Sequence, residues 1–231
     1  MKNLITILIA LLIVSCSSEK QYDLIVKGHV KGLKKGTLYL QKVKDSTLVS
    51  VDSVIVNGDP TFELHSDLET PEVFYLHLNK TNSDDKKIAF FADKGITEIH
   101  TTLKDFVFDA EIKGSKQQEK LDEYKKVMSR FNDRSLELVK EEFEAKTNRD
   151  SIAIAENQKA YESLLKGKYL YTVNFAINNK DSEVAPYVAL TEIYDAKIKW
   201  LDTINNALNP EIKSSKYGLM LDEFIKDRKS E

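Results

Sequence analysis

The chain has 231 residues, of which 42% are hydrophobic and 31% are charged, as expected for a folded globular protein. Thirty-four lysine and arginine residues stand against 37 aspartate and glutamate residues, so the formal net charge is −3. Because this balance creates no strong positive field, we expect no nucleic-acid partner. The single cysteine excludes an intramolecular disulfide and a Cys-x-x-Cys redox pair within these residues.

The first sixteen residues predict lipid attachment. A short basic start precedes a run over residues 4–14 that is apolar except for Thr6, which is typical of a secretory signal peptide. The run is too short for a membrane-spanning helix, which needs about 20 residues. Ile13-Val14-Ser15-Cys16 then resembles the bacterial lipobox, and the only cysteine of the chain stands where lipid is attached. We predict a signal peptide over residues 1–15, lipidation of Cys16, and a lipidated N-terminus and tether over residues 16–21.

The predicted lipid also indicates a location. Several acyl chains on one cysteine bind a bilayer durably, because each buried methylene contributes about 0.8 kcal/mol. Ser17 stands where an aspartate often retains lipoproteins in the inner membrane, so an outer-membrane protein that faces the periplasm is favoured. The membrane is then a partner through the lipid on Cys16. The alternative interpretation is an ordinary cysteine at a signal-peptide boundary.

The distribution of glycine divides the rest of the chain near residue 114. Six of the eight glycines lie at or before Gly114, and up to that point short apolar or alternating runs are separated by turn residues. This pattern predicts an antiparallel β-sandwich or barrel-like domain over residues 22–114. The expected strands cover Tyr22–Val30, Thr37–Val43, Leu48–Val56, Thr61–His65, Glu72–Leu78, Lys86–Ala92, Ile96–Thr101 and Phe106–Ile112.

From Ser115 onward the spacing of apolar residues becomes helical, which predicts a helical region over residues 115–231. We expect four helices: one after Ser115, one over about 150–177, one capped by Asp181-Ser182 and one after Ser214-Ser215. The third is expected to carry one continuous apolar stripe, made of Tyr187, Leu190, Tyr194, Ile198 and Leu201. The predicted fold class is therefore α+β, with a β domain followed by helices.

Short segments in a fixed order carry a family resemblance. They include Gly28-His29-Val30-Lys31-Gly32-Leu33, Phe91-Ala92-Asp93-Lys94-Gly95-Ile96 and Ser182-Glu183-Val184-Ala185-Pro186-Tyr187. Together these segments resemble the N-terminal domain of unknown function of many secreted or lipid-anchored bacterial proteins, and the region that follows it. In those proteins the domain commonly precedes a thioredoxin-like domain of the AhpC/TSA type. The resemblance spans most of residues 22–225 and implies an envelope protein.

The sequence departs from that family at its end. It stops at Glu231, where the thioredoxin-like domain would begin, and no cysteine follows Cys16. We therefore expect no thioredoxin-like domain and no thiol–disulfide activity of this chain's own, because exchange requires an attacking thiolate. The redox chemistry of the family is carried onto no residue here.

Candidate catalytic and metal-binding residues are scarce. The histidines fall in predicted strands, where alternation groups His29, His65 and His100 with charged neighbours on polar faces; the fourth is His77. No H-x-H, H-x-x-x-H or H-E-x-x-H spacing occurs, so no metal site is predicted. Nucleophile motifs and phosphate-binding loops are also absent, and no catalytic residue or cofactor is predicted.

Two functions from different classes remain open. The first is a lipid-anchored, non-catalytic binding or interaction module for an unknown envelope protein or small ligand. The second is an envelope enzyme with residues dispersed over the polar face of the β domain. A deep pocket that holds two or more histidines beside acidic groups would favour the enzyme, and a shallow apolar groove between sheet and helices would favour the module. The candidate partner surface consists of Tyr217, Leu221, Phe224 and Ile225.

Overall fold

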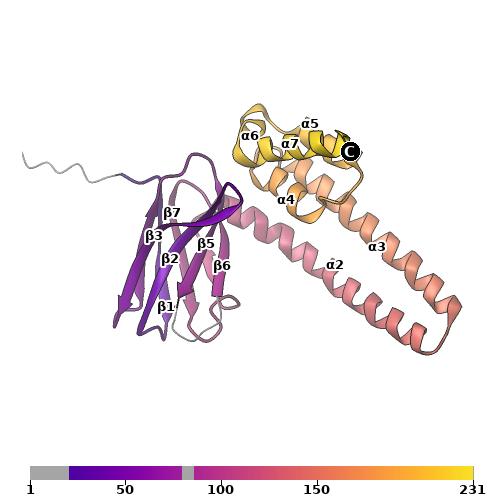
Figure 1. Cartoon of the computed structure of the whole chain (residues 1–231), viewed down its shortest axis with the longest axis horizontal. Coiled ribbons are helices and arrows are strands. Elements are labelled where there is room, and N and C mark those ends of the chain that lie inside the picture. Colours follow the sequence, from indigo (N-terminus) through magenta and orange to yellow (C-terminus); the bar gives the residue numbers. More distant parts are fainter. Residues whose placement is uncertain (1–20, 80–85, 231) are drawn as a thin grey trace, which may run out of the picture.

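The computed structural model describes residues 21–79 and 86–230. In this part of the chain, eight strands come first and the helices α2 to α7 follow (Figure 1). The α+β fold class predicted from the sequence is thus confirmed. The predicted signal peptide and the lipidation site Cys16 lie outside the described residues.

Two four-stranded sheets form the first half of the fold. One sheet has the strand order β4-β1-β7-β8, and the other has the order β3-β2-β5-β6. Apolar side chains from both sheets, such as Leu24, Leu64, Leu40 and Phe74, meet in one core between them, as in a β-sandwich. The strands are β1 (Leu24–Lys31), β2 (Lys35–Lys44), β3 (Thr47–Asn57), β4 (Thr61–Ser66), β5 (Glu72–Asn79), β6 (Lys86–Ala92), β7 (Gly95–Thr102) and β8 (Glu111–Lys113).

One strand pairing departs from the predicted antiparallel pattern. Strands β1 and β7 run parallel, with Leu24 opposite Gly95 and Lys31 opposite Thr102. Between these two strands the chain enters the other sheet twice, as β2–β3 and as β5–β6, and forms β4 of the first sheet in between, so no tight hairpin sets their relative direction. The sheet that contains them is therefore mixed.

The eighth strand differs most from its prediction. The sequence predicts a strand over Phe106–Ile112, but β8 covers only Glu111–Lys113. Residues 103–109 form a bend and turn in which Phe106 is buried, and its carbonyl accepts a hydrogen bond from Thr101 Oγ1 at 2.7 Å. Phe106 thus fills the end of the core instead of pairing in a sheet.

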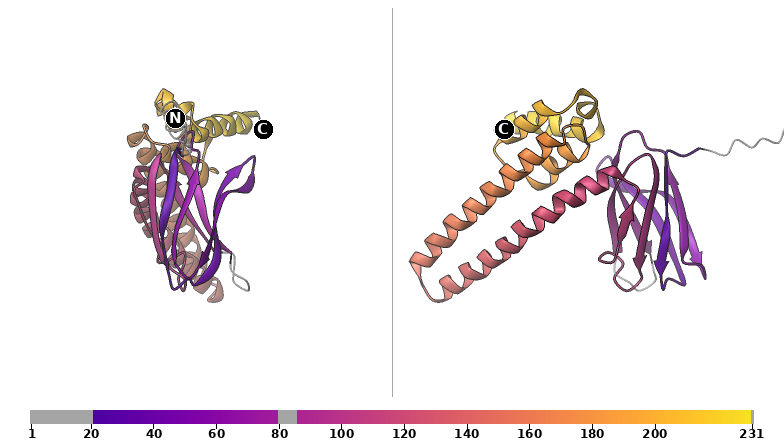
Figure 2. Two further views of the ribbon diagram at one scale, coloured as in Figure 1. Left: turned by 90° about the vertical axis from the view of Figure 1, so that its left-hand side faces the viewer. Right: turned by 180° about the vertical axis from the view of Figure 1, so that it is seen from behind.

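A long helical hairpin projects away from the sandwich (Figures 1 and 2). It consists of α2 (Lys116–Thr147) and α3 (Ser151–Asn178). Ser115 and Asp150 cap the N-termini of α2 and α3. Their side chains accept hydrogen bonds from backbone amides in the first turn of each helix. The 32 residues of α2 extend over about 48 Å at the usual rise of a helix. Nowhere in residues 21–79 and 86–230 does a helix have the length and apolar character needed to cross a membrane.

Shorter helices gather at the end of the hairpin near the sandwich (Figure 1). They are α4 (Val184–Glu192), α5 (Ile198–Ala207), α6 (Pro210–Lys213) and α7 (Lys216–Ser230). Together with α3 they enclose an apolar cluster that includes Val173, Ala189, Leu201 and Leu221.

The prediction of one continuous third helix is wrong. The chain leaves the helix after α4 and re-enters it at α5, and Tyr194, expected in the apolar stripe, is exposed in the break. Arg228 Nη1 of α7 donates hydrogen bonds to the carbonyls of Tyr194 and Ala196, at 2.7 and 2.8 Å. These carbonyls therefore have partners although no continuous helix satisfies them.

The sandwich and the helices share a further apolar cluster, which we call the junction. Val73 and Phe91 from the sheet pack there with Tyr124 and Tyr217 from the helices. Two strand amides donate to helix side chains: Val73 N to Tyr217 Oη at 3.0 Å, and Phe91 N to Gln118 Oε1 at 2.7 Å. The helical region is thus docked on the sheet by both packing and hydrogen bonds.

A buried carboxylate strengthens the junction. Glu72, at the start of β5, is 6% exposed and pairs with Lys42 Nζ of β2 at 2.9 Å. Lys216 of α7 pairs with the same carboxylate and also donates to the carbonyl of Val43. Because a buried charge is costly unless it is paired, Glu72 holds β2, β5 and α7 together.

Candidate ligand-binding site

The four residues of the candidate partner surface lie mainly in the interior. Leu221 and Ile225 pack in the apolar cluster of the helices, and Phe224 is half-buried against it. Tyr217 is 7% exposed, and its hydroxyl accepts the hydrogen bond from Val73 N. In this structure the stripe is therefore core, which follows from the need of α7 to cover both the other helices and the sheet.

A small apolar groove lies between the sheet and the helices. It has a volume of about 220 Å³. Val73 and Tyr75 line it from the sheet, while Tyr187, Tyr217 and the exposed Met220 line it from the helices. Of the candidate partner surface, only Tyr217 contributes to this groove.

The polar face of the first sheet brings two histidines together. His29 of β1 and His100 of β7 are direct neighbours in the parallel pairing. They line an open depression of about 550 Å³ with Glu63 and Glu98. His65 and His77 do not contribute to this depression.

The acidic groups of this face already have basic partners. Glu98 pairs with Lys27 at 3.3 Å, and Glu63 lies 3.2 Å from His65 Nε2. Within the described residues, no three histidine, cysteine, aspartate or glutamate side chains converge in a way that could hold a metal ion.

A cavity lies between α3 and α5, and we call it the α3–α5 pocket. Its volume is about 900 Å³, within the range of small-molecule sites. On α3 the lining residues stand three, four and seven positions after Glu162, so they share one face of that helix. The lining residues are Glu162, Leu165, Lys166 and Tyr169 from α3, and Lys197, Lys199, Trp200 and Thr203 at α5.

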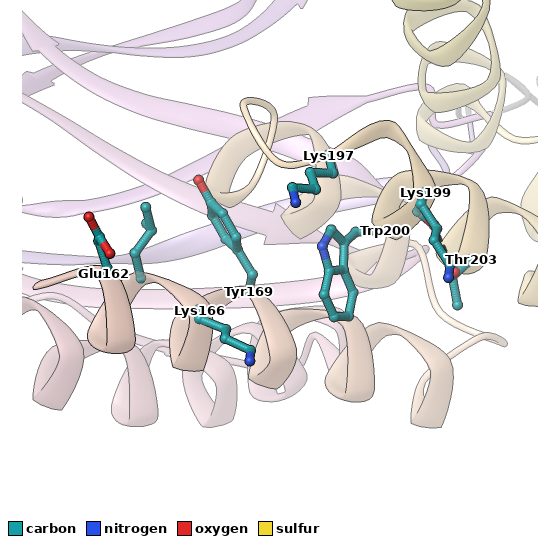
Figure 3. A pocket seen from close by; sticks show the side chains of 8 residues that line it. Glu162, Lys166, Tyr169, Lys197, Lys199, Trp200 and Thr203 are labelled. Carbon is teal, nitrogen blue, oxygen red and sulfur yellow. Dashed lines mark hydrogen bonds between the residues drawn. The ribbon is translucent and has the colours of Figure 1, made fainter. Parts of the chain in front are cut away.

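Two aromatic side chains form the apolar part of the pocket. Tyr169 and Trp200 are half-buried and pack against the apolar cluster of the helices, so one side of each ring is fixed by the core. Figure 3 shows Trp200 pointing toward α3 and Tyr169 rising from that helix. Burial, together with a hydrogen bond to Asp195 and the charge of that carboxylate, raises the pKa of Tyr169 to about 12. Tyr169 therefore stays neutral at physiological pH.

Three lysines border the aromatic pair. Figure 3 shows the side chain of Lys197 extending toward Tyr169, and Lys199 beyond Trp200 at the end away from Glu162. Among the residues that the structure describes, none forms an ion pair with the ammonium groups of Lys166, Lys197 or Lys199. The pocket thus combines an aromatic floor with three lysines that have no ion-pair partner among the described residues, although the whole chain is slightly acidic.

Sequence reasoning did not identify this pocket. Its two walls are about thirty residues apart in the chain, and their meeting depends on the break between α4 and α5. One local signal was present: the only tryptophan of the chain, Trp200, follows Lys197 and Lys199 within four residues.

The fold is a β-sandwich with an attached helical region, and the α3–α5 pocket lies in that helical region. Residues 24–121 match a family model described as a domain of unknown function (DUF4369). The match covers the sandwich and the first residues of α2, and it confirms for this segment the predicted resemblance to a domain of unknown function. No curated protein matches the chain. The α3–α5 pocket lies beyond the matched residues.

Proposed function

We propose that this protein is a lipid-anchored, non-catalytic binding module of the cell envelope that holds an apolar or aromatic ligand in the α3–α5 pocket. The observation that carries the proposal is the pocket of about 900 Å³ whose floor is formed by Tyr169 and Trp200. Rigidly supported aromatic side chains provide contact area at a low cost in conformational entropy. The apolar groove at the junction, in turn, supports a binding module rather than an enzyme.

The pocket can be tested through its own fluorophore. Trp200 is the only tryptophan of the chain and lines the pocket, so a bound ligand must change its surroundings. We expect apolar and aromatic ligands to shift the tryptophan emission in a saturable manner. The measurement is a fluorescence titration of the protein that begins at Ser17. Leu165→Asp, which places a charge on the pocket wall, should weaken binding by about tenfold or more, since burying a charge costs free energy.

A matched substitution separates the pocket from general effects. Leu136 of α2 is 69% exposed and lies outside the pocket lining, so Leu136→Asp should leave the titration unchanged. If no ligand of either class changes the emission of Trp200, the proposed binding function is wrong.

Anchoring is a separate part of the proposal. It rests on the lipobox-like sequence that ends at Cys16, which lies outside the described residues. Cys16→Ala should release the protein from membranes or leave an unprocessed precursor, because the acyl chains would have no thiol to attach to. Membrane fractionation and mass spectrometry measure both outcomes. Membrane-bound protein with an intact Met1–Ser15 segment and an unmodified Cys16 would refute the anchor.

An envelope enzyme is the second candidate function. The neighbouring His29 and His100 beside Glu63 and Glu98 favour it, since imidazole and carboxylate groups are common acid–base catalysts. If this depression is an active site, any hydrolysis that the protein shows with a panel of ester and phosphoester substrates should be lost in His29→Asn and His100→Asn. His77→Asn, in the other sheet, is the control. Activity that both variants retain would exclude this site.

A further inference from the structure

The charges around the α3–α5 pocket are arranged unevenly. Glu162 lies at one end, while Lys199 lies at the other end and Lys197 extends into the middle (Figure 3). The Glu162 carboxylate accepts a hydrogen bond from Gln158 at 3.2 Å, so it is held on its own helix. Lys166 lies one turn after Glu162 on α3, whereas no acidic residue lines the pocket at α5, so an anionic ligand is attracted more strongly at the α5 end than at the Glu162 end.

Other lysines on the helices of this region form ion pairs with carboxylates. Lys168 of α3 pairs with Glu192 at 3.1 Å, and Lys229 of α7 pairs with Asp202 of α5 at 2.7 Å. In the described part of the chain, the lysines of the pocket have no such carboxylate, although acidic residues outnumber basic ones overall. Their charges are available to a ligand.

We propose that the ligand is a single-chain lipid with one anionic headgroup, either a carboxylate or a phosphate. This inference rests on the proposed function of the same pocket and adds the chemical class of the ligand. The acyl chain lies over Leu165, Tyr169 and Trp200, which are supported by the apolar cluster of the helices. The headgroup lies on the α5 side of the pocket, which Lys197 and Lys199 border, and a charge-assisted hydrogen bond to an ammonium group there replaces part of its contacts with water.

Four probes with the same twelve-carbon chain test this inference. They are dodecanoate, dodecyl phosphate, dodecanol and dodecyltrimethylammonium, each titrated below its micelle-forming concentration against the emission of Trp200. At least one anion should bind about tenfold or more tightly than dodecanol, and the cation should bind most weakly. Whichever anion binds more tightly identifies the headgroup.

Substitution of the lysines locates the headgroup. In the double variant Lys197→Ala and Lys199→Ala, the preference for the anions over dodecanol should fall to about threefold or less, while dodecanol binds as before. Lys159→Ala is the matched control, because Lys159 is exposed on α3 but does not line the pocket. The preference should also weaken as salt is added, since the lysines are exposed.

The outcomes distinguish this inference from the proposed function. If dodecanol binds as tightly as both anions, the pocket is a ligand site but the anionic class is wrong. The same conclusion follows if the double lysine variant keeps the full preference for the anions. If none of the four probes changes the emission of Trp200, both the ligand class and its binding in this pocket are overturned; the broader binding function then depends on the apolar and aromatic ligands tested above.

Discussion

Replacing Glu183 by glutamine is expected to stabilise the protein by roughly 3 kcal/mol at about pH 8 and to leave its stability nearly unchanged at about pH 4. Glu183 is 3% exposed, where it precedes α4. Burial raises its pKa from 4.5 to about 7, against a smaller opposite effect of its hydrogen bond with Ser215. The nearby charge of Glu211 raises the pKa further.

The sign follows from the two states of the chain. Because Glu183 binds its proton more tightly in the folded protein than in the unfolded one, its contribution to stability is complete below about pH 4.5. That contribution is lost as the pH rises through about 7. Glutamine is neutral at every pH, so the variant does not lose this contribution to folding stability as the pH rises.

The hydrogen bonds around Glu183 also fit the neutral form. Ser215 Oγ lies 2.6 Å from Glu183 Oε2 and 2.7 Å from the carbonyl of Ile212. One hydroxyl proton serves only one of these acceptors. When Glu183 carries a proton it donates to Ser215, and Ser215 then donates to Ile212. The amide of glutamine can donate in the same way.

Denaturant unfolding between about pH 4 and 8 measures this effect. Glu156→Gln is the control, because Glu156 is exposed on α3 and its substitution should change stability little at any pH. If the free energy of unfolding of the Glu183→Gln variant depends on pH as that of the natural protein does, ionisation of Glu183 does not destabilise the fold and the prediction is wrong.

A second large effect is expected from Gly218→Ala, which should destabilise the protein by about 3 kcal/mol and lower its Tm by roughly 6 to 12 °C. Alanine within a helix normally stabilises that helix by about 1 kcal/mol relative to glycine. Here a Cβ atom would lie 1.9 Å from the carbonyl oxygen of Ile212 and 2.8 Å from the Cα atom of Lys213. Both contacts are with the backbone of the α6 segment, so α6 and α7 would have to move apart.

Gly167→Ala on α3 provides the comparison for this substitution. Its added Cβ would meet only the ring of Phe131, at 3.3 Å, and a side chain can shift where a backbone cannot. Thermal unfolding should therefore show a much smaller change for Gly167→Ala than for Gly218→Ala. Equal effects of the two substitutions would mean that the contact between α6 and α7 is not tight.

Local patterns predicted the sandwich well because strand alternation depends on neighbouring residues. Phe62 and Leu64 face the core, while Glu63 between them is exposed, as the alternation requires. The parallel pairing of β1 with β7 has no such local signal, because it depends on where distant strands enter the sheet. The break between α4 and α5 involves Arg228, which lies more than thirty residues away in the sequence.

The candidate site was less accessible to sequence reasoning. An apolar stripe such as Tyr217, Leu221 and Ile225 has the same spacing whether it covers a partner or the core, and the structure shows it in the core. The pocket, by contrast, includes long lysine side chains that a sequence pattern assigns to solvent. Only the fold shows that Lys197 and Lys199 share a cavity with Tyr169.

The docking of α7 on the sheet sets an order of events during folding. The hydrogen bond from Val73 N to Tyr217 joins residues 144 positions apart, as does the ion pair of Lys216 with Glu72. Neither contact can form until residues 216 and 217 have been synthesised, whereas the strands of the sandwich are complete about a hundred residues earlier. During that interval Val73 lacks its partner Tyr217, and Phe91 is covered by α2 but not yet by Tyr217. Exposed apolar surface of this kind promotes aggregation. The C-terminal helix is therefore the segment that completes the burial of the sheet, and a chain that stops short of it carries an open apolar face.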